Sequence, residues 1–232
     1  SRVSDSLKKA SFYQRVVALL IDMFIVGIIF SIVTMNFNTS YVEKLNNESL
    51  EIMNQYTSGE IGTRGYISKY ANNIYEVNRA NIYSNIVYIV ICLGYFVIFQ
   101  YLNGGASIGK RIMRIKIVGS NGGCAKLWQV LVRSCVINEI LPIFLGIILI
   151  MFSKDMTFLI LYSIISWGEN LFIIISALMI MYGKKQLGLH DIMSNSMVPS
   201  INVRDAVVTM RVSQNKIEMN DIITFISIGN LS

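Results

Sequence analysis

Charged residues and prolines are scarce in this chain of 232 residues, and each shortage excludes a class of protein. Charged residues make up 15% of the chain and there are 2 prolines, whereas 53% of the residues are hydrophobic and the mean hydropathy is +0.54. An average soluble domain is about 25% charged. The composition therefore excludes a disordered chain or a proline-rich stalk, disfavours a soluble globule and indicates a membrane protein.

Metal-binding and catalytic residue types are just as rare. The chain holds 1 histidine and 3 scattered cysteines, which cannot form a zinc ribbon or a disulfide framework. The glycine-rich stretch 104–110 lacks the spacing of a phosphate-binding loop, and no hydrolase motif is present. We therefore expect no enzyme, no metal site and no cofactor, and we interpret His190 as a polar residue at a helix end.

Long hydrophobic runs are what the sequence does provide. A membrane-spanning helix needs about 20 mostly apolar residues. Four runs approach or exceed this length: 16–35, 82–102, 136–152 and 157–182. The last two are joined by only four residues, which predicts an antiparallel helical hairpin. The predicted fold is an all-α integral membrane protein with four transmembrane helices, a small cytoplasmic β-element and an extracytoplasmic loop or cap.

The distribution of basic residues predicts the orientation. Residues 103–135 contain six basic residues and no acidic one, whereas residues 36–81 carry a slight acidic excess. Basic loops mark the cytoplasmic side of a membrane. We therefore expect both termini in the cytoplasm of a bacterial cell, with 36–81 outside. The basic residues that give the net charge of +6 are thus explained by membrane orientation. No sequence motif indicates that the chain binds nucleic acid.

The two long loops have different patterns. The outer loop contains apolar residues at helical spacing over 41–56 and again over 66–75, which predicts a small helical cap; a mobile polar loop is the alternative. In the inner loop, residues 112–118 alternate, with Arg114 and Lys116 on one face, and this alternation predicts a strand.

Three blocks of sequence resemble the RDD family of small bacterial membrane proteins. Residues 15–22 read RVVALLID, residues 109–111 read GKR, and residues 189–194 read LHDIMS. The resemblance implies that Arg15, Asp22 and Asp191 are the arginine and the two aspartates that name the family. Cation–proton antiport is attributed to some members, and others are thought to be accessory components.

The resemblance covers residues 1–198 as one membrane domain. Residues 199–232 form a cytoplasmic C-terminal extension beyond it. Their alternation of apolar and polar residues around 201–212, with a further apolar run at 222–226, predicts short strands.

The ionisable residues at the cytoplasmic border predict a clamp between elements. Arg15 and Asp22 are seven residues apart, about 10.5 Å along a helix, which is too far for an ion pair. We therefore expect Arg15 to pair with Asp191, and Asp22 to pair with Lys110 or Arg111. This clamp would serve to hold the helices to the β-element.

Carboxylates within the hydrophobic runs predict a second site. Glu169 and Asn170 lie in the middle of the last run, Glu139 lies near the inner end of the third, and Asp22 lies in the first. Intramembrane carboxylates usually face a cavity or a partner. These residues are our candidates for an ion or proton path, and the alternative for Glu169 is a hydrogen bond between helices.

Two functions remain open from the sequence. We favour an accessory or scaffold subunit that binds a partner protein in the membrane, because four spans are few for a conduction path and no inverted repeat is evident. The alternative is a cation/proton antiporter that uses the intramembrane carboxylates, which would require an oligomer. The expected partners are therefore the lipid bilayer and either further copies of the chain or another membrane protein.

Overall fold

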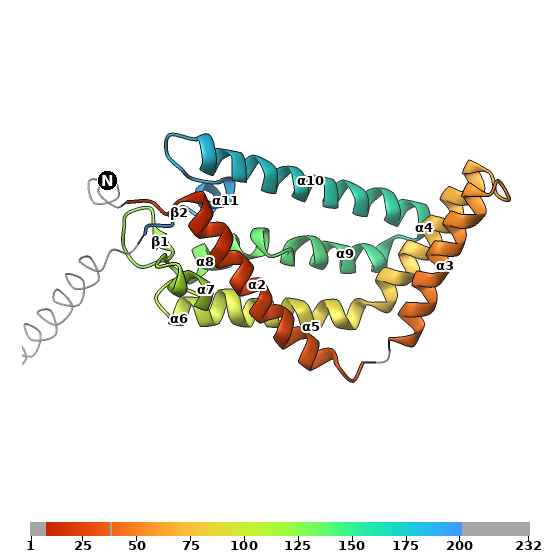
Figure 1. The fold of residues 1–232 in the computed structure, drawn as a ribbon, viewed down its shortest axis with the longest axis horizontal. Coiled ribbons are helices and arrows are strands. Elements are labelled where there is room, and N and C mark those ends of the chain that lie inside the picture. Colours follow the sequence, from red (N-terminus) through yellow and green to blue (C-terminus); the bar gives the residue numbers. More distant parts are fainter. Residues whose placement is uncertain (1–7, 38, 201–232) are drawn as a thin grey trace, which may run out of the picture.

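The computed structural model describes residues 8–37 and 39–200, and helices form almost all of their regular structure (Figure 1). In chain order these helices are α2 (Phe12–Thr34), α3 (Ser40–Thr57), α4 (Thr63–Ala80), α5 (Ile82–Cys92), the π-helical η1 (Leu93–Phe99), α6 (Gln100–Leu102), α7 (Ile108–Ile112), α8 (Leu127–Ile137), α9 (Ile140–Phe152), α10 (Asp155–Tyr182) and α11 (Leu189–Met193). Strands β1 (Val118–Gly119) and β2 (Ser196–Met197) pair antiparallel.

Three stretches of helix are long and apolar enough to cross a membrane. They are α2, the continuous α5–η1–α6 segment and α10. Helix α2 begins with a capping box in which Ser11 and Gln14 each accept a hydrogen bond from the other's backbone N–H. The chain is therefore a membrane protein, and its described residues contain three candidate spans, or four if the bent pair α8–α9 counts as one.

The third hydrophobic run departs from the expected straight span over 136–152. Helices α8 and α9 meet at an angle of 69°, and Glu139 between them has a left-handed backbone with φ of 56°. Helix α9 has 13 residues, so it is about 20 Å long, which is shorter than the hydrocarbon core of a bilayer. This run is therefore a broken element rather than a simple transmembrane helix.

Helices α3 and α4 form a hairpin where the two amphipathic stretches are predicted. The hairpin lies at the end of the molecule opposite β1 and β2 (Figure 1). The Asn73 side chain donates a hydrogen bond to the Leu45 carbonyl at 3.0 Å and so fastens α4 to α3. The Tyr75 ring packs edge-on against Phe158 with centroids 5.6 Å apart, which attaches the hairpin to α10.

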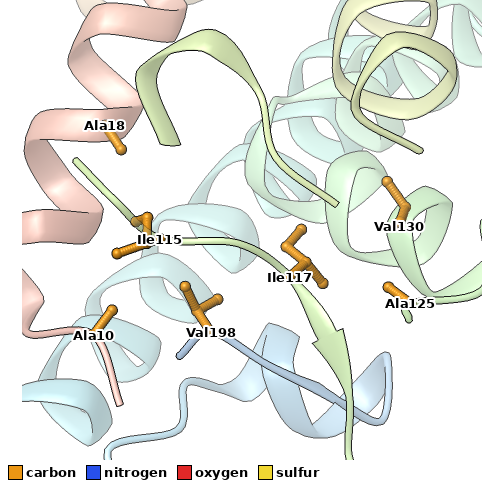
Figure 2. Close-up of a cluster of buried hydrophobic side chains, with 7 residues drawn as sticks. All are labelled: Ala10, Ala18, Ile115, Ile117, Ala125, Val130 and Val198. Atoms are coloured by element: carbon orange, nitrogen blue, oxygen red, sulfur yellow. The ribbon is translucent and has the colours of Figure 1, made fainter. Parts of the chain in front are cut away.

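The opposite end holds the small β-element, and its bounds differ from the predicted strand over 112–118. Helix α7 continues to Ile112, and Arg114 has a left-handed φ of 56°, so regular pairing starts only at Val118. Ile115 and Ile117 both point inward, each 1% exposed. Figure 2 shows the apolar cluster that they form with residues from α2, α8, the segments just before these two helices and the segment after β2: Ala10, Ala18, Ala125, Val130 and Val198.

The chain after β2 closes this end of the molecule. Pro199 pairs with Lys9, and Ser200 pairs with Ile115, as single antiparallel bridges. The strands predicted around 201–212 and 222–226 lie outside the described residues.

Candidate functional site

Asp22 of α2 is buried, and three neutral groups donate hydrogen bonds to its carboxylate; we call Tyr95, Ser107 and Gly109 the Asp22 cradle. Its Oδ1 accepts hydrogen bonds from the Tyr95 hydroxyl at 2.7 Å and from the Gly109 N–H at 2.8 Å. Its Oδ2 accepts a bond of 2.5 Å from the hydroxyl of Ser107. Tyr95 lies on η1, and Ser107 is the N-cap residue of α7, so Asp22 joins three elements. Three short bonds satisfy the carboxylate without a cation.

The expected ion pair of Asp22 with Lys110 or Arg111 is therefore wrong for the described residues. The Lys110 ammonium donates to Gln100 Oε1 at 2.5 Å, and the exposed Arg111 donates to Asn103 Oδ1 at 2.7 Å. Desolvation, reinforced by the nearby Arg133 guanidinium, lowers the pKa of Lys110 to about 7.

A close approach of α7 to α2 makes the cradle possible. A Cβ atom at Gly109 would lie 2.2 Å from the Ala18 carbonyl oxygen and 2.9 Å from Asp22 Cγ. No larger residue fits without displacing one helix. The close contact between α7 and α2 thus explains why the Gly-Lys-Arg block begins with a glycine.

A second buried cluster joins Arg15, Arg133 and Asp191. Arg15 Nη1 lies 2.7 Å from Asp191 Oδ2, which is the pairing expected from the sequence, and its Nη2 donates to the Gln186 carbonyl at 3.1 Å. Arg133 of α8 forms an ion pair with the other carboxylate oxygen. Burial alone would raise the pKa of Asp191, but the guanidiniums of Arg133 and Arg15 hold it well below its ordinary value.

The sequence does not predict Arg133 as a member of this cluster, because it counts there only as one of the basic residues of the inner loop. It lies three positions after Val130, which is fully buried, so helical spacing places both on one face. An arginine on the apolar face of an amphipathic helix is the signal that could have identified it.

His190 ties α11 to α10 and remains uncharged. Its Nδ1 lies 2.7 Å from the Ser176 hydroxyl, and that hydroxyl also accepts from the Leu189 N–H at 3.1 Å. Burial, with a further contribution from Arg133, lowers the pKa of His190 to about 3. Among the described residues, no group of three or more histidine, cysteine, aspartate or glutamate side chains could hold a metal ion.

One cavity lies beside these clusters, and a smaller one lies farther along α10. The larger, of about 500 Å³, lies between α2, α8 and α10, and Arg15, Asp22, Lys110 and Arg133 line it together with many apolar side chains. The smaller, of about 140 Å³, lies between α9 and α10. Its polar lining consists of Glu139, Tyr162, Ser166, Glu169 and Asn170.

Glu139 and Glu169 reach the same level of the molecule from different elements. Counted from the turn between α9 and α10, Glu139 lies about 20 Å along α9, and Glu169 lies about 21 Å along α10. Among the described residues, Glu169 Oε1 is buried without a hydrogen-bond partner, and no basic residue lines this cavity. The structure thus brings two of the four path candidates together beside a third, Asn170.

Asp22 stands apart from this carboxylate pair. It lines the larger cavity and not the smaller one, whereas Glu139 lines both. Next to Glu139, the Asn138 side chain is 3% exposed, and its Oδ1 has no hydrogen-bond partner. The break between α8 and α9 therefore places unpartnered polar atoms where the two cavities adjoin.

A comparison with protein-family models gives one match. The model of the RDD family covers residues 9–195, well over half of the chain. No curated protein and no solved structure matches the chain.

Proposed function

We propose that this chain, which belongs to the RDD family of membrane proteins, exchanges protons for monovalent cations at Glu139 and Glu169. Family membership confirms the resemblance seen in the sequence. The observation that carries the proposal is that two carboxylates from different elements line one small polar cavity with no basic residue among them.

Charge explains why such a pair would bind a proton or a cation. Two carboxylates that share one site repel each other, and a bound proton or cation relieves this repulsion. With one proton, the pair carries one negative charge. With both groups ionised and one monovalent cation bound, it carries the same charge. One proton can therefore leave as one cation enters, and the net charge of the site is unchanged.

The broken helix supplies further oxygen ligands. The last carbonyl groups of a helix have no partner within it, and those of α8 end next to Glu139. Transporters place coupling-ion sites at such interruptions, where unwound backbone and helix ends face a cavity. The 69° bend and the polar cavity at Glu139 support this interpretation over the scaffold role favoured from sequence.

The test is ion-driven proton flux in proteoliposomes that contain the full chain. We expect Glu169→Gln and Glu139→Gln to lower the flux at least about tenfold, because an amide keeps the shape but cannot exchange a proton. Glu76→Gln is the matched control, since Glu76 lies on the α3–α4 hairpin and pairs with Arg79 at 3.6 Å. Wild-type protein that moves neither Na⁺ nor K⁺ against protons would contradict the proposal.

Partner binding is a second candidate, and a different observation favours it. The rings of Tyr56, Tyr66 and Tyr70 stack in a row on the hairpin, with centroids 4.6 and 5.6 Å apart. Tyrosine is enriched at protein interfaces. Under this alternative, Tyr66→Ala should reduce binding of a purified partner while leaving cation flux unchanged.

A further inference from the structure

The larger cavity combines apolar walls with a cationic end. Its apolar lining comes from α2, α8 and α10, including Val16, Leu19, Phe172 and Ala177. Its volume of about 500 Å³ falls within the roughly 300–1,000 Å³ of small-molecule sites. Because two of these helices are membrane spans, a lipid acyl chain can approach the walls from the bilayer.

The charges at the cationic end do not balance locally. The carboxylates of Asp191 and Asp22 lie next to Arg15, Arg133 and Lys110, so this end carries one positive charge in excess when Lys110 is protonated, while Glu139 lines the cavity at the break between α8 and α9. Asp191 already serves both arginines. The oxygens of Asp22 are occupied by neutral donors, as described above.

Lys110 is the group with donors to spare. An ammonium has three N–H donors, and among the described residues Lys110 uses one of them, toward Gln100. Burial, reinforced by the Arg133 guanidinium, lowers its pKa to about 7, and an anion bound beside it would favour the charged form. Glu139 also lines the cavity, but among the described residues it forms no ion pair with Lys110, Arg15 or Arg133.

We propose that this cavity binds one anionic phospholipid, with its phosphate beside Lys110 and Arg133 and one acyl chain along the apolar walls. A soluble anion would neutralise the positive charge but would leave the space between the apolar walls unfilled. A zwitterionic lipid would fill that space but would leave the positive charge uncompensated. Basic pockets between transmembrane helices recognise anionic head groups by this combination.

Binding is measured on the purified full chain in detergent, by native mass spectrometry and by the shift in thermal unfolding. The probes are phosphatidylglycerol, phosphatidylcholine with the same acyl chains, and inorganic phosphate. We expect phosphatidylglycerol to remain bound and to raise the unfolding temperature, and the other two to do neither. An equal shift with phosphatidylcholine, or a shift with inorganic phosphate alone, would overturn the proposal.

Two pairs of variants locate the site. Lys110→Gln should weaken phosphatidylglycerol binding about tenfold, while its neighbour Arg111→Gln, a change on the exposed surface, should not. Ala177→Phe should exclude the acyl chain from the cavity. Ile174→Phe places the same ring on the exposed face of α10, where Ile174 is 55% accessible, and should leave binding unchanged.

Each outcome of the variant series is informative even if one variant folds poorly. Lys110→Gln tests the head group and Ala177→Phe tests the chain, and each can be compared with its control at equal folded yield. Undiminished lipid binding in both site variants would overturn the proposal. Because the readout is lipid binding, this result is independent of whether the chain moves ions.

Discussion

At the scale of single residues, Asp191 is the side chain on which the largest number of buried charges depends. It pairs with Arg15 and Arg133, and its Oδ2 also accepts the Gly188 N–H at 3.0 Å. Removing one member of a buried ion pair leaves the other charge uncompensated. After loss of one arginine, Asp191 is still paired with the other arginine. After loss of Asp191, two buried guanidiniums have no counter-ion.

Asp191→Ala should accordingly destabilise the protein more than Arg15→Ala. We expect a loss of about 3–5 kcal/mol for Asp191→Ala, and a smaller loss for Arg15→Ala because Arg133 still neutralises the aspartate. The double variant should lose less than the sum of the two single losses. Unfolding of the purified variants in detergent measures all three, and strictly additive losses would mean that Arg15 and Asp191 do not interact.

His190 should make the folded state sensitive to mild acid. Its pKa is about 3 in the folded chain against an ordinary value of 6.5, so the unfolded chain takes up a proton first as the pH falls. Stability is therefore lost between about pH 6.5 and 3, amounting to about 2 kcal/mol at pH 5 relative to pH 7.5. Thermal unfolding of wild type and His190→Gln at both pH values measures this, and an equal pH effect in the two proteins would refute it.

At the scale of elements, the contact of α7 with α2 depends on one missing side chain. Gly109 lets the α7 backbone reach Asp22, and Ser107 and Tyr95 complete the cradle from α7 and η1. A Cβ at Gly109 would overlap the backbone carbonyl of Ala18 as well as the Asp22 carboxylate, so the two helices would have to separate.

Gly109→Ala should therefore be strongly destabilising although alanine favours helices. We expect a loss of several kcal/mol, because the helix shift breaks the bonds to buried Asp22. Gly27→Ala is the matched control: Gly27 lies within α2, and its Cβ would meet nothing within 4 Å. The folded yield and unfolding temperature of both variants decide the point, and equal effects would contradict the close-approach argument.

The positions of the membrane-spanning helices could be predicted from the sequence, but the breaks in the helices could not. The apolar runs predict α2, α5–η1–α6 and α10 because lipid imposes a long hydrophobic stretch on each span. The bend at Glu139 and the left-handed Arg114 depend on tertiary contacts, which no local pattern carries. Likewise, the pairing of Arg15 with Asp191 could be predicted because both residues are charged. The donors to Asp22 are a hydroxyl, a phenol and a backbone N–H, and these uncharged groups leave no charge pattern in the sequence.

At the scale of the whole molecule, the two ends differ in charge and structure. The end with β1 and β2 carries the inner basic loop and the buried ion pairs, and the other end carries the α3–α4 hairpin (Figure 1). The spans lie between them. From the positive-inside rule we expect the β-element to face the cytoplasm and the hairpin to face outward.

Single-cysteine labelling tests this orientation in intact cells. With Cys92, Cys124 and Cys135 replaced, Thr57→Cys on the hairpin should react with a membrane-impermeant reagent, and Asn121→Cys beside β1 should react only after the membrane is opened. Both positions are exposed on the protein surface, so any difference in labelling reflects the side of the membrane on which each lies. Labelling of Asn121→Cys in intact cells would reverse the topology.

The most direct measurement of the central claim is proton release on cation binding. Adding NaCl or KCl to weakly buffered purified protein should release up to one proton per chain, because under the proposed exchange the entering cation displaces one proton from the cavity lined by Glu139 and Glu169. N-methylglucamine chloride at the same ionic strength should release none. Glu169→Gln and Glu139→Gln should abolish the release, while Glu76→Gln preserves it. No cation-specific release from the folded wild-type chain, or an undiminished release from folded Glu169→Gln, would contradict the account.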